Sequence, residues 1–153
     1  MNAVNENPYS AVQILLVEDD DIDAEAIGRA FRKAKIANPT HRVCDGMEAL
    51  EVLRGNAASA ISHPYLVLLD LNLPRLDGIG FLREIRADAS LKGTIVFVLT
   101  TSDDDADKIA AYDEQIAGYM VKSRAGKDFM NLINMLDHYW RVVEFPPEKL
   151  DGT

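Results

Sequence analysis

The sequence predicts an α/β fold, namely a three-layer sandwich in which helices cover both faces of a central five-stranded parallel sheet. Short apolar runs alternate five times with longer segments of helical periodicity, which is typical of strands joined by right-handed helical crossovers. The clearest run, residues 66–69, is apolar at every position, as expected of a strand buried on both faces. It leads directly into Asp70. Because reactive groups in such sheets lie where the strands end, we expect Asp70 at the centre of the functional site.

Each further element has its own signal in the sequence. The remaining strands are expected at residues 12–17, 40–44, 95–99 and 118–121, and the helices at residues 21–35, 47–54, 77–87, 103–113 and 126–143. In the first helix Ile22, Ile27 and Phe31 share one apolar face, and acids at its start and bases at its end suit the helix dipole. Asp45 and the run Asp103-Asp104-Asp105 are expected to cap the helices that they precede.

Length, charge and cysteine content narrow the class of protein. The 153 residues suit one domain, residues 12–143, between a flexible lead-in, residues 1–11, and a C-terminal tail, residues 144–153. A net charge of −9 argues against nucleic acid or an anionic membrane as partner. Cys44 is the single cysteine, so we expect no intrachain disulfide, a buried thiol and a reducing, cytoplasmic setting. Neither a leader peptide nor a membrane-spanning run is expected.

Four of the predicted strand ends carry groups suited to one chemistry. Glu18 and Asp19 follow the first strand, Asp70 the third, Thr100 the fourth and Lys122 the fifth. Since the carboxyl ends of parallel strands share one edge of a sheet, we expect these side chains to converge. Carboxylate oxygens suit Mg²⁺, with Mn²⁺ as a substitute, and a carboxylate beside such a cation can attack phosphorus. Lys122 and the Thr100 hydroxyl would then stabilise the phosphoryl oxygens.

With these residues in this order and spacing, the chain resembles the receiver domain of two-component response regulators, which has a flavodoxin-like fold. The resemblance covers residues 12–140. It implies that Asp70 accepts a phosphoryl group from the phosphohistidine of a histidine kinase. It also implies that Asp19, Asp70 and the backbone carbonyl of Asn72 bind Mg²⁺, with Glu18 acting through water. A domain of this kind catalyses its own phosphotransfer and dephosphorylation and is not a multiple-turnover enzyme.

The same resemblance assigns a switch to Thr100 and Tyr119. In the family the hydroxyl moves to the phosphoryl group and the aromatic ring turns inward, which makes a two-state element biased by one local charge. Asn72 and Ser102 stand where the family tunes the lifetime of the aspartyl phosphate.

One departure from the family concerns the peptide bond after Lys122. The family usually has a cis proline there, whereas this chain has Ser123. A cis bond without proline costs about 3 kcal/mol, so the sequence leaves the isomer and the direction of Lys122 open. The Lys-Ser pair, Thr-Thr-Ser at residues 100–102 and the Trp-bearing apolar C-terminus resemble single-domain regulators of phytochrome-type kinases. A bacteriophytochrome is the expected kind of kinase partner. The expected output is a protein contact, a competing phosphate sink or a relay step.

The last predicted helix carries an apolar stripe that extends past the length the sheet can cover. Its members are Phe129, Leu132, Ile133, Leu136, Tyr139, Trp140 and Val143, continued by Val142, Phe145, Pro146 and Pro147. An exposed apolar stripe usually marks an interface, so we expect a homodimer formed by the fourth helix, the last helix and the tail. The competing expectation is that the tail folds back on its own domain.

Two other functions compete with a phosphorylated switch. A Mg-dependent phosphatase or phosphotransferase of the haloacid dehalogenase type also uses a strand-end aspartate. That family needs a second acid two residues later, where this chain has Asn72. A protein-binding module could keep the fold and never be phosphorylated, but the intact acids, Thr100 and Lys122 argue against it. Each of these residues is ordinary by itself, and the prediction depends on their convergence at one edge.

Overall fold

The computed structural model describes residues 12–56 and 61–147, and its five strands form one sheet in which every pairing is parallel. The order across the sheet is β2-β1-β3-β4-β5. The strands are β1 (Gln13–Val17), β2 (Thr40–Val43), β3 (Tyr65–Leu69), β4 (Val96–Thr100) and β5 (Gly118–Val121). The predicted five-stranded parallel sheet is confirmed, with small shifts at the strand ends.

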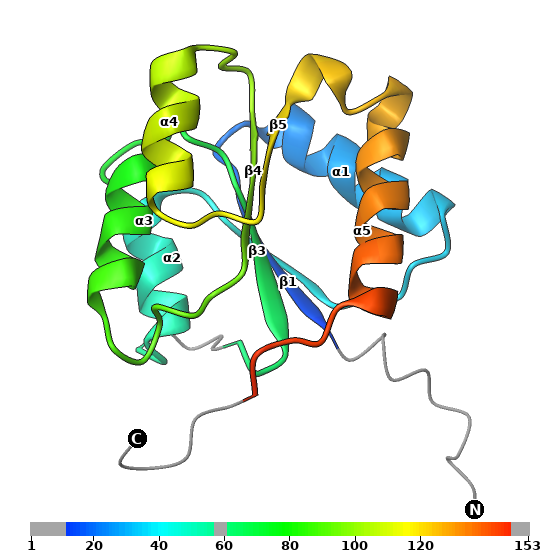
Figure 1. The fold of residues 1–153 in the computed structure, drawn as a ribbon. Helices are drawn as coiled ribbons and strands as arrows, with labels where there is room; N and C mark the ends of the chain where they lie inside the picture. The colour runs from blue at the N-terminus through cyan, green and yellow to red at the C-terminus, as the bar shows by residue number, and fades with distance from the viewer. Residues whose placement is uncertain (1–11, 57–60, 148–153) are drawn as a thin grey trace, which may run out of the picture.

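Helices cover both faces of this sheet (Figure 1). They are α1 (Asp21–Lys33), α2 (Gly46–Leu53), α3 (Gly78–Ala87), α4 (Asp105–Asp113) and α5 (Met130–Val142), and two short 3-10 turns, η3 (Lys122–Arg124) and η4 (Lys127–Phe129), join β5 to α5. Figure 1 shows α1 and α5 on one face and α2, α3 and α4 on the other. This is the three-layer sandwich that the alternation predicts. Within the described residues, no helix is long and apolar enough to cross a lipid bilayer.

The two faces of β3 explain why its sequence is apolar at every position. Leu66 and Leu68 belong to the core on the side of α1 and α5, whereas Val67 and Leu69 belong to the core on the side of α2, α3 and α4. All four side chains are fully buried. Burial of each such side chain contributes about 1.5–3 kcal/mol to folding. The strand that leads into Asp70 is consequently anchored from both sides.

Four helices begin at an aspartate that caps the helix. The carboxylates of Asp20, Asp45, Asp77 and Asp104 accept hydrogen bonds from backbone N–H groups in the first turns of α1, α2, α3 and α4. The predicted cap at Asp45 is confirmed, and within the acidic run before α4 the capping residue is Asp104. Because each of these helices follows a strand, the caps also fix the loops at the carboxyl edge of the sheet.

The connection between β5 and α5 differs from the prediction of one helix over residues 126–143. Gly126, Asp128 and Phe129 have positive φ angles of 91°, 55° and 62°. These values lie outside the right-handed helical region, so residues 127–129 form the turn η4 instead, and α5 begins only at Met130. Apolar periodicity detects the helix but not these turns, because a positive φ at a non-glycine residue leaves no mark in that pattern.

Two side chains expected in the core lie outside it. Ile22 is 78% exposed, and the buried residues of α1 begin only at Ile27. Cys44 is exposed because it lies in the loop after the edge strand β2. The expectation of a buried thiol at Cys44 is therefore wrong, as is the assignment of Ile22 to the apolar face.

The segment after α5 folds back along its own domain, which matches the competing expectation for the apolar C-terminus. The Tyr139 ring meets the Phe97 ring edge-on at a centroid distance of 4.8 Å and the Phe145 ring at 6.0 Å. Trp140 is 2% exposed. Figure 1 shows the red segment after α5 passing beneath the strands. Most of the predicted stripe thus packs on the core of the chain itself, whereas Val142 is 79% exposed.

Candidate functional site

Two acidic residues lie side by side at the carboxyl edge because β1 and β3 are neighbours in register. Val17 pairs with Leu69, which brings Glu18 next to Asp70, and the Asp70 N–H donates to the Val17 carbonyl at 3.0 Å. Glu18 is 1% exposed and Asp70 is 6% exposed. A carboxylate withdrawn from water needs compensating partners. The groups around these two acids consequently decide what the site can do.

Asp19 completes a group of three carboxylates. Oxygen atoms of Glu18, Asp19 and Asp70 lie within 4.8 Å of one another, and Asp19 is exposed whereas the other two are buried. An oxygen-only donor set suits a small divalent cation such as Mg²⁺ or Mn²⁺ rather than zinc or copper. The N–H of Asn72 donates to Asp70 Oδ1 at 3.3 Å. The residues present therefore fit a divalent-cation site that is open to solvent at Asp19.

One ammonium group faces this acidic cluster. Lys122 directly follows β5, and its Nζ lies 2.7 Å from Asp23 Oδ2, 2.8 Å from Glu18 Oε1 and 3.0 Å from Asp70 Oδ2. Burial alone would lower the pKa of Lys122, but the hydrogen bonds to Asp23, Glu18 and Asp70 outweigh burial and raise that pKa above its usual range. Lys122 is thus a permanent positive charge beside Asp70.

Negative charge at the site exceeds what Lys122 neutralises. Burial raises the pKa of Glu18 from 4.5 to about 7 despite the hydrogen bond from Lys122, and the charge of Asp70 acts in the same direction as burial. Burial is the larger cause of this pKa, and the repulsion from Asp70 is the part that a bound cation would relieve. The electrostatics of the site therefore agree with the donor set in favouring a divalent cation.

The loop after β4 connects Thr100 and Ser102 to Tyr119. Thr100 is the last residue of β4 and fully buried, and its Oγ1 accepts a hydrogen bond from the Ser102 N–H at 3.4 Å. The Tyr119 hydroxyl donates to the Ser102 carbonyl at 2.9 Å, and Ser102 Oγ donates to Asp107 Oδ2 at 2.5 Å. Since Tyr119 belongs to β5 and Asp107 to α4, the loop is bonded to both elements.

The structure brings Glu18, Asp19, Asp70 and Lys122 together, as the shared strand edge predicts, and places Thr100 at the end of the neighbouring strand β4. The Lys122–Ser123 bond is not among the cis peptide bonds of the described residues, so it is trans, and Lys122 still reaches Asp70. This resolves the isomer that the sequence leaves open.

Asp23 is the member of the cluster that the sequence does not reveal. It lies in the first turn of α1, where an acid is ordinarily explained by the helix dipole. Its contact with Lys122 spans 99 positions of sequence. A signal of periodicity or spacing cannot show such a contact, because it depends on the rotamers of two side chains.

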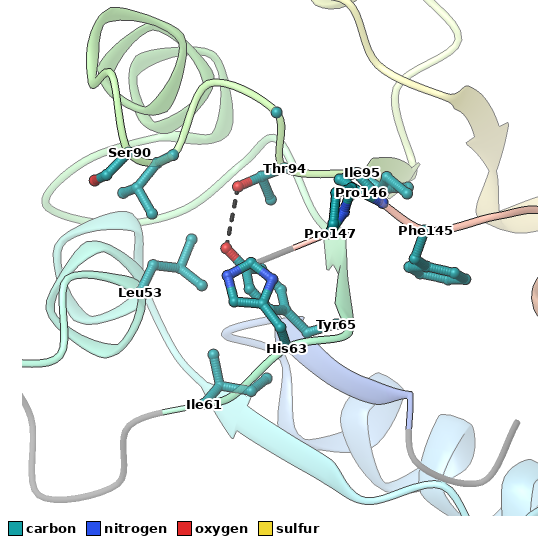
Figure 2. A pocket seen from close by; sticks show the side chains of 12 residues that line it. Leu53, Ile61, His63, Tyr65, Ser90, Thr94, Ile95, Phe145, Pro146 and Pro147 are labelled. Carbon is teal, nitrogen blue, oxygen red and sulfur yellow. Dashed lines mark hydrogen bonds between the residues drawn. The ribbon is translucent and has the colours of Figure 1, made fainter. Parts of the chain in front are cut away.

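A separate pocket of about 250 Å³ lies at the opposite edge of the sheet. Figure 2 shows Tyr65 from the start of β3, with His63 from the loop before β3 and Thr94 from the loop before β4; Phe145 and Pro146 of the C-terminal segment lie beside them. Tyr65 Oη and Thr94 Oγ1 share a hydrogen bond of 3.2 Å. Its described lining contains no carboxylate, so this pocket is distinct from the acidic site.

A family model for the response regulator receiver domain matches residues 14–134, which is more than half of the chain. The chain therefore belongs to the response regulator receiver domains, the class of two-component signalling proteins that the fold and the acidic edge indicate. Its parallel sheet between two helical layers is the flavodoxin-like fold of the solved receiver structures.

Two individual relatives are equally similar in sequence to this chain. Response regulator Rcp1 of Synechocystis is 36% identical over 128 residues, which cover 83% of this chain and 87% of Rcp1. The probable methanogenesis regulatory protein FilR2 of Methanothrix harundinacea is also 36% identical, over 127 residues that cover 83% of this chain and 82% of FilR2. Identity alone thus does not select one pathway.

Two solved structures agree closely in fold. The phosphorylated cyanobacterial phytochrome response regulator RcpA is 34% identical with a TM-score of 0.80, and the match covers 90% of this chain and 99% of RcpA. The Mn²⁺-bound form of Rcp1 is 34% identical with a TM-score of 0.76, and the match again covers 90% of this chain and 99% of the other. The chain is therefore similar to a phytochrome response regulator, as the narrower resemblance in the sequence predicts.

Proposed function

We propose that this protein is the phospho-acceptor of a two-component system and that Asp70 receives a phosphoryl group from the phosphohistidine of a histidine kinase. The observation that carries the proposal is the 3.0 Å contact between Lys122 Nζ and Asp70 Oδ2 beside the carboxylates of Glu18 and Asp19. A carboxylate oxygen of Asp70 attacks phosphorus. The new P–O bond forms as the bond from phosphorus to the histidine nitrogen breaks, and that nitrogen keeps the electron pair.

Lys122 and Thr100 stabilise the transferred group. Charge spreads over the phosphoryl oxygens in the transition state, where donors that are already in place are most effective. Lys122 donates to one phosphoryl oxygen, and the Thr100 hydroxyl donates to another. Water later attacks phosphorus and regenerates the Asp70 carboxylate. Each chain therefore carries at most one phosphoryl group and acts as a switch rather than as a multiple-turnover enzyme.

The divalent-cation ligands are Asp19, Asp70 and the backbone carbonyl of Asn72, and Glu18 acts through water. The cation is Mg²⁺, for which Mn²⁺ can substitute, and when bound it neutralises charge on the phosphoryl group. The oxygen-only donors and the repulsion between Glu18 and Asp70 support this assignment. The relative Rcp1 has been solved in a Mn²⁺-bound form, which also supports the assignment.

The signal leaves the site through Thr100 and Tyr119, and Asn72 and Ser102 set the lifetime of the aspartyl phosphate. The hydrogen bonds that join Thr100 to Ser102 and Ser102 to Tyr119 support this route, since they connect the buried strand end to β5. A rearrangement at Thr100 would break or redirect them.

The partner is a phytochrome-type histidine kinase in the cytoplasm, and the active form is a homodimer built by α4, α5 and the tail. The relatives described as phytochrome response regulators support the kinase, and the net charge of −9 disfavours nucleic acid and anionic membranes. Exposed Ile109, Tyr112 and Val142 support the interface.

The receiver domain is residues 12–143, with a lead-in at 1–11 and a tail at 144–153, of which 1–11 and 148–153 lie outside the described residues.

Acetyl phosphate with Mg²⁺, followed by intact mass, tests the acceptor directly. We expect the parent to gain one phosphoryl group and the Asp70→Asn variant to gain none. Equal gain in both proteins would contradict the assignment of Asp70. A phosphotransfer profile across purified histidine kinases then tests the partner, and faster transfer from a kinase outside the phytochrome class would overturn that part of the proposal.

A further inference from the structure

Asp23 contacts the catalytic lysine without belonging to the group of three carboxylates. Its Oδ2 lies 2.7 Å from Lys122 Nζ, which is the shortest of the three carboxylate contacts of that ammonium group. The Asp23 N–H donates to Asp20 Oδ1 at 3.0 Å, so the N-cap of α1 fixes the position of residue 23. The contact therefore originates from a well-defined turn of backbone.

The ammonium group of Lys122 has three N–H donors, and the structure supplies one carboxylate for each. Glu18 comes from the end of β1, Asp70 from the end of β3 and Asp23 from α1. The direction of Lys122 is thereby set from three sides. A lysine side chain is long and flexible, and the loss of one fixed partner allows it to sample other rotamers.

We propose that Asp23 is a positioning residue that holds the Lys122 ammonium over the Asp70 carboxylate. The inference rests on the proposed function, because it concerns the donor that meets the arriving phosphoryl group. As Asp70 is phosphorylated, Lys122 exchanges its hydrogen bond to Asp70 for one to a phosphoryl oxygen and keeps its bonds to Asp23 and Glu18. No proton is transferred in this exchange.

The three carboxylates differ in exposure, and Asp23 is the one whose removal should affect the position of Lys122 without removing its charge. The side chain of Asp23 is 30% exposed, against 2% for Glu18 and 7% for Asp70. Without the Asp23 carboxylate, water can take the third donor of Lys122. The ammonium group then remains charged but is no longer fixed, which affects the transfer step more than the binding of a phosphodonor.

The chain offers a matched control in the same turn of α1. Asp21→Asn removes the same charge as Asp23→Asn, but the Asp21 side chain is 88% exposed and pairs with Arg42 Nη1 at 2.8 Å. With acetyl phosphate and Mg²⁺, we expect Asp23→Ala to lower the maximal rate of phosphorylation roughly tenfold. The concentration of acetyl phosphate that gives half of the maximal rate should stay unchanged. Asp21→Asn should leave the rate unchanged, and Asp23→Glu should restore part of it. Asp23→Asn replaces Asp23→Ala if the latter does not fold.

A double-mutant cycle separates positioning from a general structural effect. In a Lys122→Met background, Asp23→Ala should cause no further loss of rate, because the side chain that it positions is gone. Equal additional losses in both backgrounds would overturn the proposal. Faster phosphorylation of Asp23→Ala would also overturn it, since that result means that Asp23 restrains Lys122 or repels the phosphodonor.

A readout without any phosphodonor tests the contact itself. In a ¹H–¹⁵N spectrum of the lysine ammonium groups, the Lys122 signal can be assigned by its absence in Lys122→Arg. We expect the Lys122 ammonium protons to exchange slowly with water, and the signal to be visible, in the parent and in Asp21→Asn. It should broaden or vanish in Asp23→Ala, and an unchanged signal there would refute the positioning role. If the parent protein takes up no phosphoryl group, the proposed function and the role of Asp23 in phosphotransfer are both overturned. Loss of the Lys122 signal in Asp23→Ala would still support the conclusion that Asp23 positions Lys122.

Discussion

Lys122 Nζ lies 3.0 Å from Asp70 Oδ2, although the two residues are 52 positions apart in the sequence and their strands are not neighbours. β4 lies between β3 and β5, so the lysine side chain reaches past the end of β4, where Thr100 is located. One ion pair therefore closes the site across three strands. Lys122 also supplies positive charge to two carboxylates, those of Glu18 and Asp70, that are almost fully buried.

Replacement of Lys122 by methionine should destabilise the domain. Glu18 and Asp70 would remain buried without their counter-charge, and removal of one partner of a buried ion pair costs about 3–5 kcal/mol. We expect the free energy of unfolding in urea at neutral pH to fall by about 3 kcal/mol. Mg²⁺ should restore part of the loss, because the cation supplies the missing positive charge.

Lys108→Met is the control for that experiment. Lys108 lies on α4 and pairs with Asp103 and Asp105, whose side chains are exposed, so solvent screens the charges. Its removal should change the unfolding free energy little. A similarly small change for Lys122→Met would contradict the conclusion that Lys122 compensates buried negative charge.

Asp19→Asn should abolish the stabilisation by Mg²⁺ without changing the protein in the absence of the cation. Asp19 is the exposed member of the three carboxylates, so its replacement disturbs no core contact. A ligand at 100 times its Kd stabilises the folded state by about 2.7 kcal/mol. Thermal unfolding at increasing Mg²⁺ concentration should show this gain in the parent and in Asp21→Asn. The same gain in Asp19→Asn would remove Asp19 from the ligand set.

The fold and most of the site are readable in the sequence because parallel topology converts local patterns into a shared location. Residues 66–69 must be apolar on both sides, and the residue after such a strand must lie at the carboxyl edge. This reasoning brings together Glu18, Asp19, Asp70 and Lys122, whose oxygens and ammonium nitrogen indeed meet. No detail of side-chain geometry is needed for that conclusion.

The features that the sequence does not reveal depend on such detail. The contact between Asp23 and Lys122 requires a particular pair of rotamers, and the turns before α5 require positive φ at Asp128 and Phe129. Exposure of Cys44 follows from the place of β2 at the edge of the sheet, which strand order alone determines. Periodicity records none of these properties.

Asp45 should contribute stability that disappears in acid. Its Oδ1 accepts the Glu48 N–H at 2.8 Å as N-cap of α2, and its Oδ2 lies 2.9 Å from Arg75 Nε. Burial alone would raise the pKa of Asp45, but the bonds from Arg75 and the Glu48 N–H hold it below its ordinary value of 3.8. A pKa lowered by folding gives stability that is present above 3.8 and lost as pH falls through the folded value.

Two variants at position 45 separate the cap from the charge. Asp45→Ala loses both and should lower the unfolding free energy at pH 7 by about 1 kcal/mol. Asp45→Asn keeps an N-cap oxygen and should lose less, because Arg75 is largely exposed and its ion pair is screened. The difference between the parent and Asp45→Asn should shrink in urea titrations below pH 3.8. A difference that stays constant with pH would show that the charge of Asp45 contributes nothing.

Glutamate at Val142 or Ile109 should dissociate the proposed homodimer and leave the fold intact. Val142 is 79% exposed on α5 and Ile109 is 63% exposed on α4, so neither is needed for the core, and surface changes of this kind usually alter stability by less than about 0.5 kcal/mol. Ile22→Glu is the matched control, because Ile22 is 78% exposed but lies on α1. Sedimentation equilibrium of the phosphorylated and unphosphorylated proteins should show a dimer for the parent and for Ile22→Glu and monomers for Val142→Glu and Ile109→Glu. A monomeric parent in both states would end the dimer hypothesis, and the packing of Phe145 on Tyr139 would then account for the apolar C-terminus by itself.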